Sequence, residues 1–402
     1  MTALLIFLGV YFVLAVGRLP GFRVDRTGAA IIGAALMVGA GVLTLDQAYR
    51  AINFDTIVLL FGMMIVAANL RLSGFFTVAG AWAVERARRP LALLAAIVAV
   101  SGALSAVFVN DTMCLVLTPL VAEITVALKR NPVPYLLGVA MASNIGSAAT
   151  ITGNPQNMLI GSYSGIPYAR FAAASAPVAA IGLVATVAAI YLFHRDEFRH
   201  SDRLAAFHHP HRLNRPLMWK ALAVSAGMLA FFFAGWAVPK VAVVGGAVLL
   251  LTRRVKPAKI YVQVDWPLLV MFAGLFVVVA GMEQSGLEQR LAEAVASLRL
   301  DNVYVLTALA AAISNIVSNV PAVLIFKPFL AHMAHPERAW LTLAAASTLA
   351  GNLTVVGSIA NLIVVERARG QARIGFWDYA RVGIPLTLAT LAMAAVRMSW
   401  LG

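Results

Sequence analysis

Residues 142–161 read ASNIGSAATITGNPQNMLIG and lie in a segment that is otherwise apolar enough to cross a bilayer. The stretch carries amide side chains at Asn144, Asn154 and Asn157, and the Gly-Asn-Pro sequence at 153–155 breaks a helix. A lipid-facing helix cannot hold such polarity, because hydrocarbon offers polar groups no partners. We therefore expect a broken membrane helix that faces a cavity inside the protein.

The composition indicates a membrane protein. The 402 residues are 61% hydrophobic and 12% charged, whereas soluble domains average about 45–50% apolar and 25% charged residues. We expect an all-α polytopic fold in the lipid bilayer. The net charge of +14 indicates basic cytoplasmic loops, and no nucleic-acid partner is expected because no basic segment belongs to a soluble domain. The single cysteine, Cys114, excludes an internal disulfide.

Two apolar stretches, 91–128 and 303–334, are longer than one span and have polar centres. Each could be two full spans or a re-entrant hairpin, and we favour hairpins because a polar turn is tolerated where it faces a cavity. Most of the 31 Lys and Arg residues, including Arg18, Arg23 and Arg26, then fall on one side, which the positive-inside rule makes cytoplasmic. We expect an inner-membrane protein with both termini periplasmic.

The two halves of the chain match in order, which predicts a repeat. Residues 1–193 and 218–402 form the repeats, and 194–217 form a cytoplasmic linker. Each half has five spans, counting one broken helix (134–161 and 341–365), plus one hairpin (91–128 and 303–334). An odd number of crossings gives an inverted-topology repeat, as in many secondary transporters. The linker histidines His200, His208, His209 and His211 could bind metal or sense pH, but a solvated linker is favoured because no ligand cage is nearby.

Specific residues of the repeats are expected to correspond. Asn110 and Asn319 each precede a proline by nine residues. In the broken helices, we expect Asn144 to correspond to Asn352. Gly153 and Asn157 are expected to correspond to Gly357 and Asn361, if the second half lacks four residues of the break.

Discontinuous helices in matching positions of two repeats point to a transport site. Exposed helix N-termini attract anions and exposed carbonyl groups coordinate cations. Helix packing through small polar residues is the alternative, but repeated Asn-containing breaks favour a site. The expected substrate-binding residues are Asn110, Thr112, Asn144, Asn157, Ser318, Asn319, Asn352 and Asn361.

Asp111 is the sharpest single candidate, because an acidic residue inside a membrane segment is a functional candidate by default. It either couples transport to a cation or caps the hairpin tip. The expected cation-coupling set is Asp111, Asn110, Asn144, Gly153, Asn319 and Gly357, with Na⁺ or H⁺ as the coupling ion and no other metal or cofactor. Lys327 could neutralise an anion or Asp111, or reach the membrane interface.

The stretch SNIGSAATITGNPQNMLIG resembles the anion-permease and arsenite-permease branch of the ion transporter superfamily, in which Gly-(Asn/Asp)-Pro-x-Asn follows an Asn-Ile-Gly start. The resemblance covers the chain after the first helix and implies the fold and a homodimer. The related divalent anion:sodium symporters carry Ser-Asn-Thr at both hairpin tips. This chain has Asn110-Asp111-Thr112 and Ser318-Asn319-Val320 instead.

Together these features predict a secondary active transporter that moves a small anion or oxyanion, driven by H⁺ or Na⁺. The alternatives are an arsenite efflux permease, or a sodium/proton antiporter without an anionic substrate. A channel is disfavoured by the repeat with a midplane site. An enzyme is not expected, because the chain has no nucleotide-binding loop, metal-ligand spacing or catalytic serine elbow.

Overall fold

A computed structural model of the chain describes residues 1–19, 21–199, 213–253, 255–285, 299–330 and 333–401. These residues form helices and one isolated β-bridge, between Arg18 and Asp25. Seven of the described helices are long and apolar enough to cross a membrane. The prediction of an all-α polytopic protein is therefore confirmed. The four linker histidines lie outside the described residues.

The first half contains ten described α-helices and one short 3₁₀ helix, and an eleventh α-helix opens the linker. They are α1 (Thr2–Val16), α2 (Arg26–Gly39), α3 (Leu45–Ala51), α4 (Phe54–Ser73), α5 (Phe75–Arg86), α6 (Pro90–Val107), α7 (Asn110–Ala127), α8 (Pro132–Ser147), η1 (Ile151–Gly153), α9 (Pro155–Ser164), α10 (Tyr168–Phe193) and α11 (Arg195–Arg199).

The second half contains nine described α-helices and two short 3₁₀ helices. Its helices are α12 (Arg215–Phe233), α13 (Val238–Leu250), α14 (Pro257–Tyr261), α15 (Trp266–Gln284), α17 (Val303–Val317), α18 (Asn319–Leu330), α19 (Pro336–Leu349), η2 (Ala350–Asn352), η3 (Val355–Gly357), α20 (Ile359–Ala368) and α21 (Phe376–Ser399).

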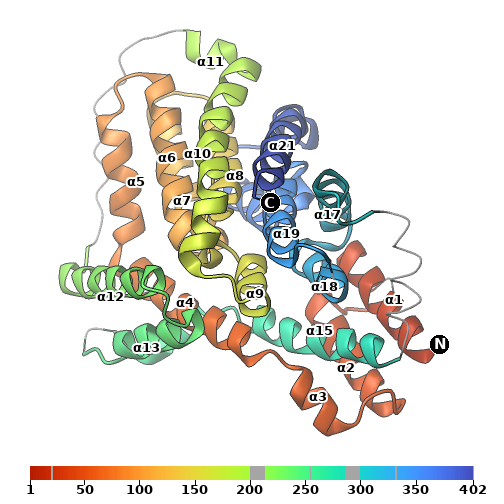
Figure 1. Cartoon of the computed structure of the whole chain (residues 1–402). Helices are drawn as coiled ribbons and strands as arrows, with labels where there is room; N and C mark the ends of the chain where they lie inside the picture. The colour runs from red at the N-terminus through yellow and green to blue at the C-terminus, as the bar shows by residue number, and fades with distance from the viewer. Residues whose placement is uncertain (20, 200–212, 254, 286–298, 331–332, 402) are drawn as a thin grey trace.

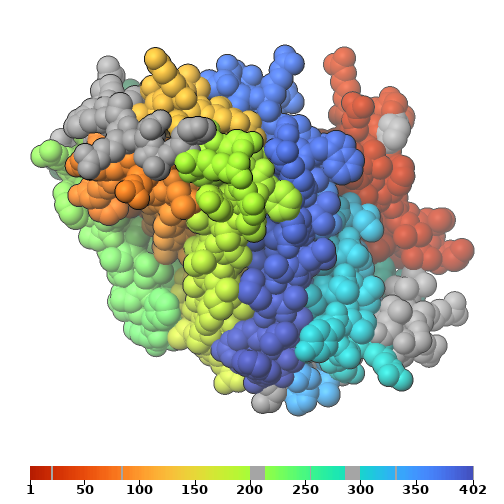
Figure 2. All heavy atoms as spheres, turned by 90° about the horizontal axis from the view of Figure 1, so that it is seen from above, coloured from red at the N-terminus to blue at the C-terminus, as the bar shows by residue number. Residues whose placement is uncertain are grey.

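The helices lie in two crossing groups. Figure 1 shows α5, α6, α10 and α21 upright, with α4, α12, α13 and α15 running across beneath them. The long helices α10 and α21 end the two halves and lie side by side in Figures 1 and 2. The short helix α9 lies where the two groups meet (Figure 1).

The two halves interlock through a reciprocal contact. Helix α13 packs on α4, and α2 packs on α15. A Cβ atom on Gly62 of α4 would meet the Ala242 carbonyl oxygen of α13 at 2.5 Å, and one on Gly274 of α15 would meet the Ala30 oxygen of α2 at 2.8 Å. Because glycine lets helix backbones approach closely, both contacts depend on its missing side chain.

Both long apolar stretches form pairs of helices joined by very short turns. Phe108 and Val109 connect α6 to α7, and Ser318 alone connects α17 to α18. The re-entrant path of these hairpins through a membrane stays a prediction. Each broken helix has an irregular segment at its centre, with η1 between α8 and α9, and η2 and η3 between α19 and α20.

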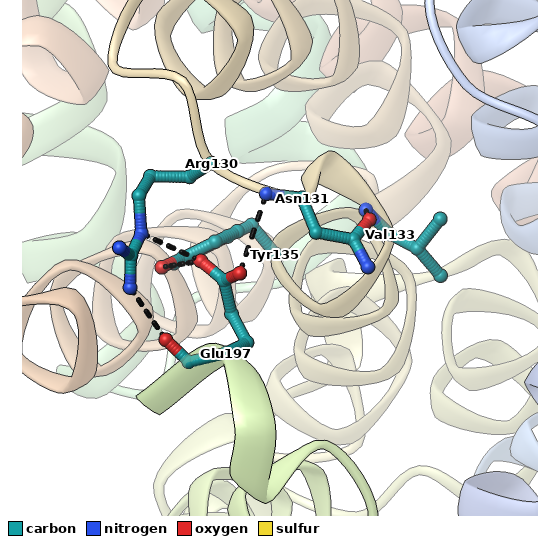
Figure 3. Close-up of polar contacts among 5 residues, drawn as sticks. All are labelled: Arg130, Asn131, Val133, Tyr135 and Glu197. Carbon is teal, nitrogen blue, oxygen red and sulfur yellow. Dashed lines mark hydrogen bonds and ion pairs between the residues drawn. The ribbon is translucent and has the colours of Figure 1, made fainter. Parts of the chain in front are cut away.

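A part-buried ion pair joins the start of the linker to the end of the first hairpin (Figure 3). Glu197 of α11 accepts from Arg130 Nε at 2.8 Å and from the Tyr135 hydroxyl at 3.0 Å, and its backbone oxygen accepts from Arg130 Nη2 at 2.5 Å. The Arg130 and Glu197 side chains are only 17% and 13% exposed. This contact joins the α7–α8 connection and the start of α8 to α11, which directly follows α10.

Candidate transport site

The hairpin tips each start a helix with an asparagine. Asn110 opens α7 after the extended residue Phe108, and Asn319 opens α18 after Ser318. Ser318 has φ 79° and ψ 160°, a region that residues other than glycine rarely adopt and that costs about 1–3 kcal/mol. Such strain persists where surrounding contacts hold the chain in place, and it commonly marks functional segments. The second tip is therefore the strained one.

The irregular centres of the two broken helices have the same backbone path. Thr150 and Thr354, which precede η1 and η3, have φ/ψ of −141°/164° and −141°/166°. The Asn157 Nδ2 atom donates to the carbonyl oxygens seven and ten residues before it, at 2.9 and 3.2 Å. The Asn361 Nδ2 atom does the same in the second half, at 3.0 and 2.7 Å. Each amide thus satisfies carbonyl groups at the end of the helix before the break.

The equal spacings correct one sequence expectation. Because the breaks match with no deletion, the counterpart of Asn144 is Thr348, and Asn352 corresponds to Ala148. The prediction that Asn144 corresponds to Asn352 is wrong. The shared amide side chain suggested that pairing, but the hydrogen bonds around Asn157 and its counterpart set the register.

Asn144 instead bonds across the halves and uses all of its hydrogen-bonding capacity. Its Nδ2 group donates to the Oδ1 atoms of Asn352 at 2.8 Å and Asn361 at 2.9 Å. Its Oδ1 atom accepts from Asn110 Nδ2 and the Ser358 hydroxyl, both at 3.1 Å. An amide offers two donors and one oxygen with two lone pairs. Asn144 therefore holds the first tip against the second break and has no group left for a solute.

The two tips and the two breaks enclose one cavity. The lining residues are Leu14, Arg26, Asn110, Asp111, Pro155, Gln156, Leu268, Met271, Ser318, Asn319, Val320, Pro321, Ser358 and Ile359. The N-termini of α7, α9, α18 and α20 all reach it. The volume open to water is about 60 Å³, whereas one buried water needs about 10–15 Å³ on the same measure. The cavity thus has room for a few waters or a small ion.

The predicted site residues fall into two shells around this cavity. Asn110, Asp111, Ser318 and Asn319 line it directly. The remaining predicted residues do not line it: Thr112, Asn144, Gly153, Asn157, Asn352, Gly357 and Asn361. Six of these seven are buried, Thr112 being partly exposed, and the asparagines among the seven hold the tips and breaks together.

Gly153 and Gly357 serve the backbone of the breaks. A Cβ atom on Gly153 would collide with the Ser147 carbonyl oxygen, and one on Gly357 would meet the Gly351 oxygen at 2.9 Å. Only glycine permits so close an approach. These two residues let each chain fold back on its preceding helix.

Three polar cavity residues were not expected from the sequence. Arg26 had the pattern of an ordinary loop arginine, and Gln156 and Ser358 lacked a matching residue type in the other half. Their position directly after a breaking residue, at the start of a helix, is the signal that could have found Gln156 and Ser358. Arg26 also opens a helix, but only the tertiary structure shows that the α1–α2 hairpin places it at the cavity.

Asp111 lines the cavity without a hydrogen-bonding or ion-pairing partner among the described residues. Lys327 does not neutralise it, because Lys327 Nζ pairs with Glu283 Oε1 at 2.8 Å and lies 5.0 Å from the ring centre of Tyr163. Asn110 Oδ1 is buried and also has no partner. The described chain holds no cluster of three His, Cys, Asp or Glu side chains.

A second, larger cavity lies farther along α9, α15 and α18. It measures about 530 Å³ and is lined by Asn53, Asp55, Tyr163, Phe276, Glu283, Leu324 and Lys327, among others. Leu324 follows Val320 by one helical turn, and Lys327 follows it by two, so one face of α18 passes from the central cavity to this one. We call the second cavity the vestibule.

Comparisons with known proteins agree on one class. The family profile described as "Citrate transporter" matches residues 10–350. The chain is 31% identical to an uncharacterised transporter of Mycobacterium tuberculosis over 97% of both proteins. It is 30% identical to the silicon efflux transporter LSI3 of Oryza sativa subsp. japonica, over 96% of this chain and 95% of the relative. The solved structure of the Alcanivorax borkumensis YdaH transporter shares the fold, with a TM-score of 0.65 and 16% identity over 100% of this chain and 97% of that one.

Proposed function

The chain belongs to the citrate transporter family and is a multi-pass membrane transporter, and we propose that it is a secondary active transporter of a small anion or oxyanion coupled to H⁺ or Na⁺. We place it in the inner membrane, as an inverted-topology repeat with two re-entrant hairpins and periplasmic termini. We also propose a homodimer, on the resemblance to the ion transporter superfamily.

One observation supports the proposal that the substrate is an anion. Four helix N-termini, those of α7, α9, α18 and α20, reach the same cavity. Each N-terminus has unpaired N–H groups and a partial positive charge, which favours a bound anion by about 0.3–1 kcal/mol in exposed settings and more where water is excluded. Discontinuous helices in both repeats use this arrangement in secondary transporters.

Asp111 supplies the proposed coupling to a cation. A carboxylate without a partner is expensive in a membrane protein unless a proton or cation joins it. The unpartnered Asn110 Oδ1 next to it is the kind of neutral oxygen that accompanies a carboxylate around a hard cation. Asn110, Asp111 and Asn319, each opening a hairpin helix, are therefore our candidates to hold Na⁺, or Asp111 alone to carry H⁺.

The vestibule supports the proposed topology. The ends of α9, α15 and α18, the end of α3 and the start of α4 meet there. In a topology set by the basic loops, all of these ends lie on the periplasmic side. We infer that the vestibule is the periplasmic approach to the central cavity, with Phe276 and Leu324 between the two spaces.

The topology can be tested with single cysteines in a Cys114→Ala background. Gly370→Cys lies in the turn between α20 and α21, and Asp46→Cys lies on exposed α3. In intact cells an impermeant thiol reagent should label position 46 and leave position 370 unlabelled until the cells are opened. The opposite pattern would invert the whole arrangement.

A second candidate function is the transport of a neutral hydroxylated solute. It is favoured by the 30% identity to a protein named a silicon efflux transporter. Arsenite, the substrate of the arsenite-permease alternative, is likewise neutral at physiological pH. A sodium/proton antiporter without an anionic substrate requires only Asp111, as the carboxylate that binds Na⁺ and H⁺ in turn.

Reconstitution into liposomes separates these functions. Uptake of phosphate, arsenate, sulfate and citrate is compared with that of neutral arsenite and silicic acid, under an imposed Na⁺ or pH gradient. We expect gradient-driven uptake of at least one anion. Uptake of neutral solutes alone would replace the proposal by the second candidate, and Na⁺/H⁺ exchange without solute uptake would indicate the antiporter.

A further inference from the structure

The central cavity holds a positive charge that no other described group neutralises. Arg26 opens α2 and lines the cavity, half-buried. Its Nε atom donates to the Leu14 carbonyl oxygen at the end of α1, at 3.0 Å. Among the described residues no carboxylate lies within ion-pairing distance of Arg26, and its other guanidinium N–H groups have no protein acceptor.

The bond to Leu14 fixes the direction of the guanidinium group. Arginine has five N–H donors in one plane, and this bond uses one of them. A planar group held on one edge is prepared to bind a carboxylate, phosphate or similar oxyanion with two parallel hydrogen bonds. A neutral solute would leave the positive charge without compensation.

Arg26 and Asp111 line the same cavity without pairing with each other. Two unpaired opposite charges around one small space suit two ligands of opposite charge, because each ligand then neutralises one side chain. The cavity volume of about 60 Å³ has room for a few waters at about 10–15 Å³ each. An oxyanion with few heavy atoms fits this space better than a large polycarboxylate does.

We propose that Arg26 contacts the transported substrate directly and makes the cavity selective for small oxyanions over neutral solutes. This inference rests on the proposed function, since it assumes that the cavity is the transport site. It assigns the anion to the α1–α2 side of the cavity and the coupling cation to the first hairpin tip.

The test uses the full-length protein in liposomes with three variants. Arg26→Gln removes the charge, Arg26→Lys keeps the charge without the planar fork, and Arg23→Gln is the matched control on the same connection, where Arg23 is exposed. Uptake of phosphate, arsenate and sulfate is measured beside that of neutral arsenite and silicic acid, and thermal unfolding reports folding and anion binding.

For the oxyanion that the wild type carries, Arg26→Gln should lower kcat/KM at least tenfold and abolish the anion-induced rise in melting temperature. Arg26→Lys should recover part of the loss, Arg23→Gln should match the wild type, and uptake of any neutral solute should not fall in Arg26→Gln. Equal oxyanion uptake by Arg26→Gln and wild type would overturn this inference and leave the proposed function standing. A wild type that carries no oxyanion would overturn both.

If Arg26→Gln does not fold, Arg26→Lys decides the question. An unchanged kcat/KM for the oxyanion in Arg26→Lys would overturn a two-bond contact by Arg26. A loss of oxyanion uptake with retained uptake of a neutral solute would support the contact, because misfolding would remove both.

Discussion

The two broken helices have the same backbone and different side chains, and the difference separates support from function. Asn157 and Asn361 bond to carbonyl oxygens at the same spacings in both halves. Their neighbours differ, since Asn144 makes four hydrogen bonds where its counterpart Thr348 makes longer contacts of 3.1–3.4 Å. The hydrogen bonds that the two halves share, those of Asn157 and Asn361, therefore stabilise the breaks themselves.

The hairpin tips differ in the same way. Asn110 and Asn319 both open a helix at the cavity, but Asp111 in the first tip corresponds to Val320 in the second. Among the described residues, the one unpaired carboxylate that lines the cavity therefore belongs to one half. A symmetric scaffold that carries an asymmetric set of charges can bind two different ligands at one place.

The largest expected effect concerns that asymmetric charge. Asp111→Asn keeps the size of the side chain and removes its charge, so it should preserve folding and abolish uptake that is driven by a pH or Na⁺ gradient in liposomes. Glu366→Gln, in an exposed pair with Arg369, is the control. Gradient-driven uptake retained by Asp111→Asn would reduce Asp111 to a helix cap.

Asn144→Ala should be more harmful than Thr348→Ala. It leaves buried partners in both halves without a hydrogen bond, each at a cost of about 1–3 kcal/mol of stability, and it should lower uptake because the first tip is no longer held against the second break. Thermal unfolding and uptake assays measure both effects. Equal losses in the two variants would contradict the difference between the halves.

Arg130→Ala should destabilise the protein by about 1.5–3 kcal/mol, because it removes charge-assisted bonds to the part-buried Glu197. Arg369→Ala breaks an exposed pair and should cost about 1 kcal/mol or less. Chemical denaturation in detergent compares them. A similar cost for both would show that the anchor at the first hairpin adds nothing beyond a surface contact.

Asn157→Ala and Asn361→Ala should have nearly equal effects on stability, about 1–3 kcal/mol each, because their amides satisfy equivalent carbonyl groups. Both variants should unfold at lower temperature than the wild type by similar amounts. A large difference would mean that the bonds to the side-chain oxygens, from Asn144 at 2.9 Å in Asn361 and from Thr348 at 3.4 Å in Asn157, outweigh the shared contacts.

The smallest expected effect compares the two tips. Ser318→Gly should stabilise the protein by about 1 kcal/mol, because glycine accepts φ 79° without strain. The counterpart Val109→Gly should destabilise, because Val109 has φ −53° and is buried. Melting temperatures of the two variants should move in opposite directions. A fall in both would mean that the Ser318 side chain outweighs the strain.

The sequence by itself determined the class of the protein and the places where its helices break. Partitioning into a bilayer depends on local composition, and the Gly-Asn-Pro break at 153–155 acts on its own helix. The polar tips at Asn110 and Asn319 could be found for the same reason, since a polar centre in an apolar stretch is visible without knowing its surroundings.

Only the tertiary structure decided which polar groups face the cavity. Asn144 is occupied by Asn352 and Asn361, which lie 208 and 217 residues away in the sequence, and Arg26 reaches the cavity because the α1–α2 hairpin lies against the second tip. The residue type states what a side chain can bind, but whether its donors and acceptors are already used depends on partners that only folding brings together.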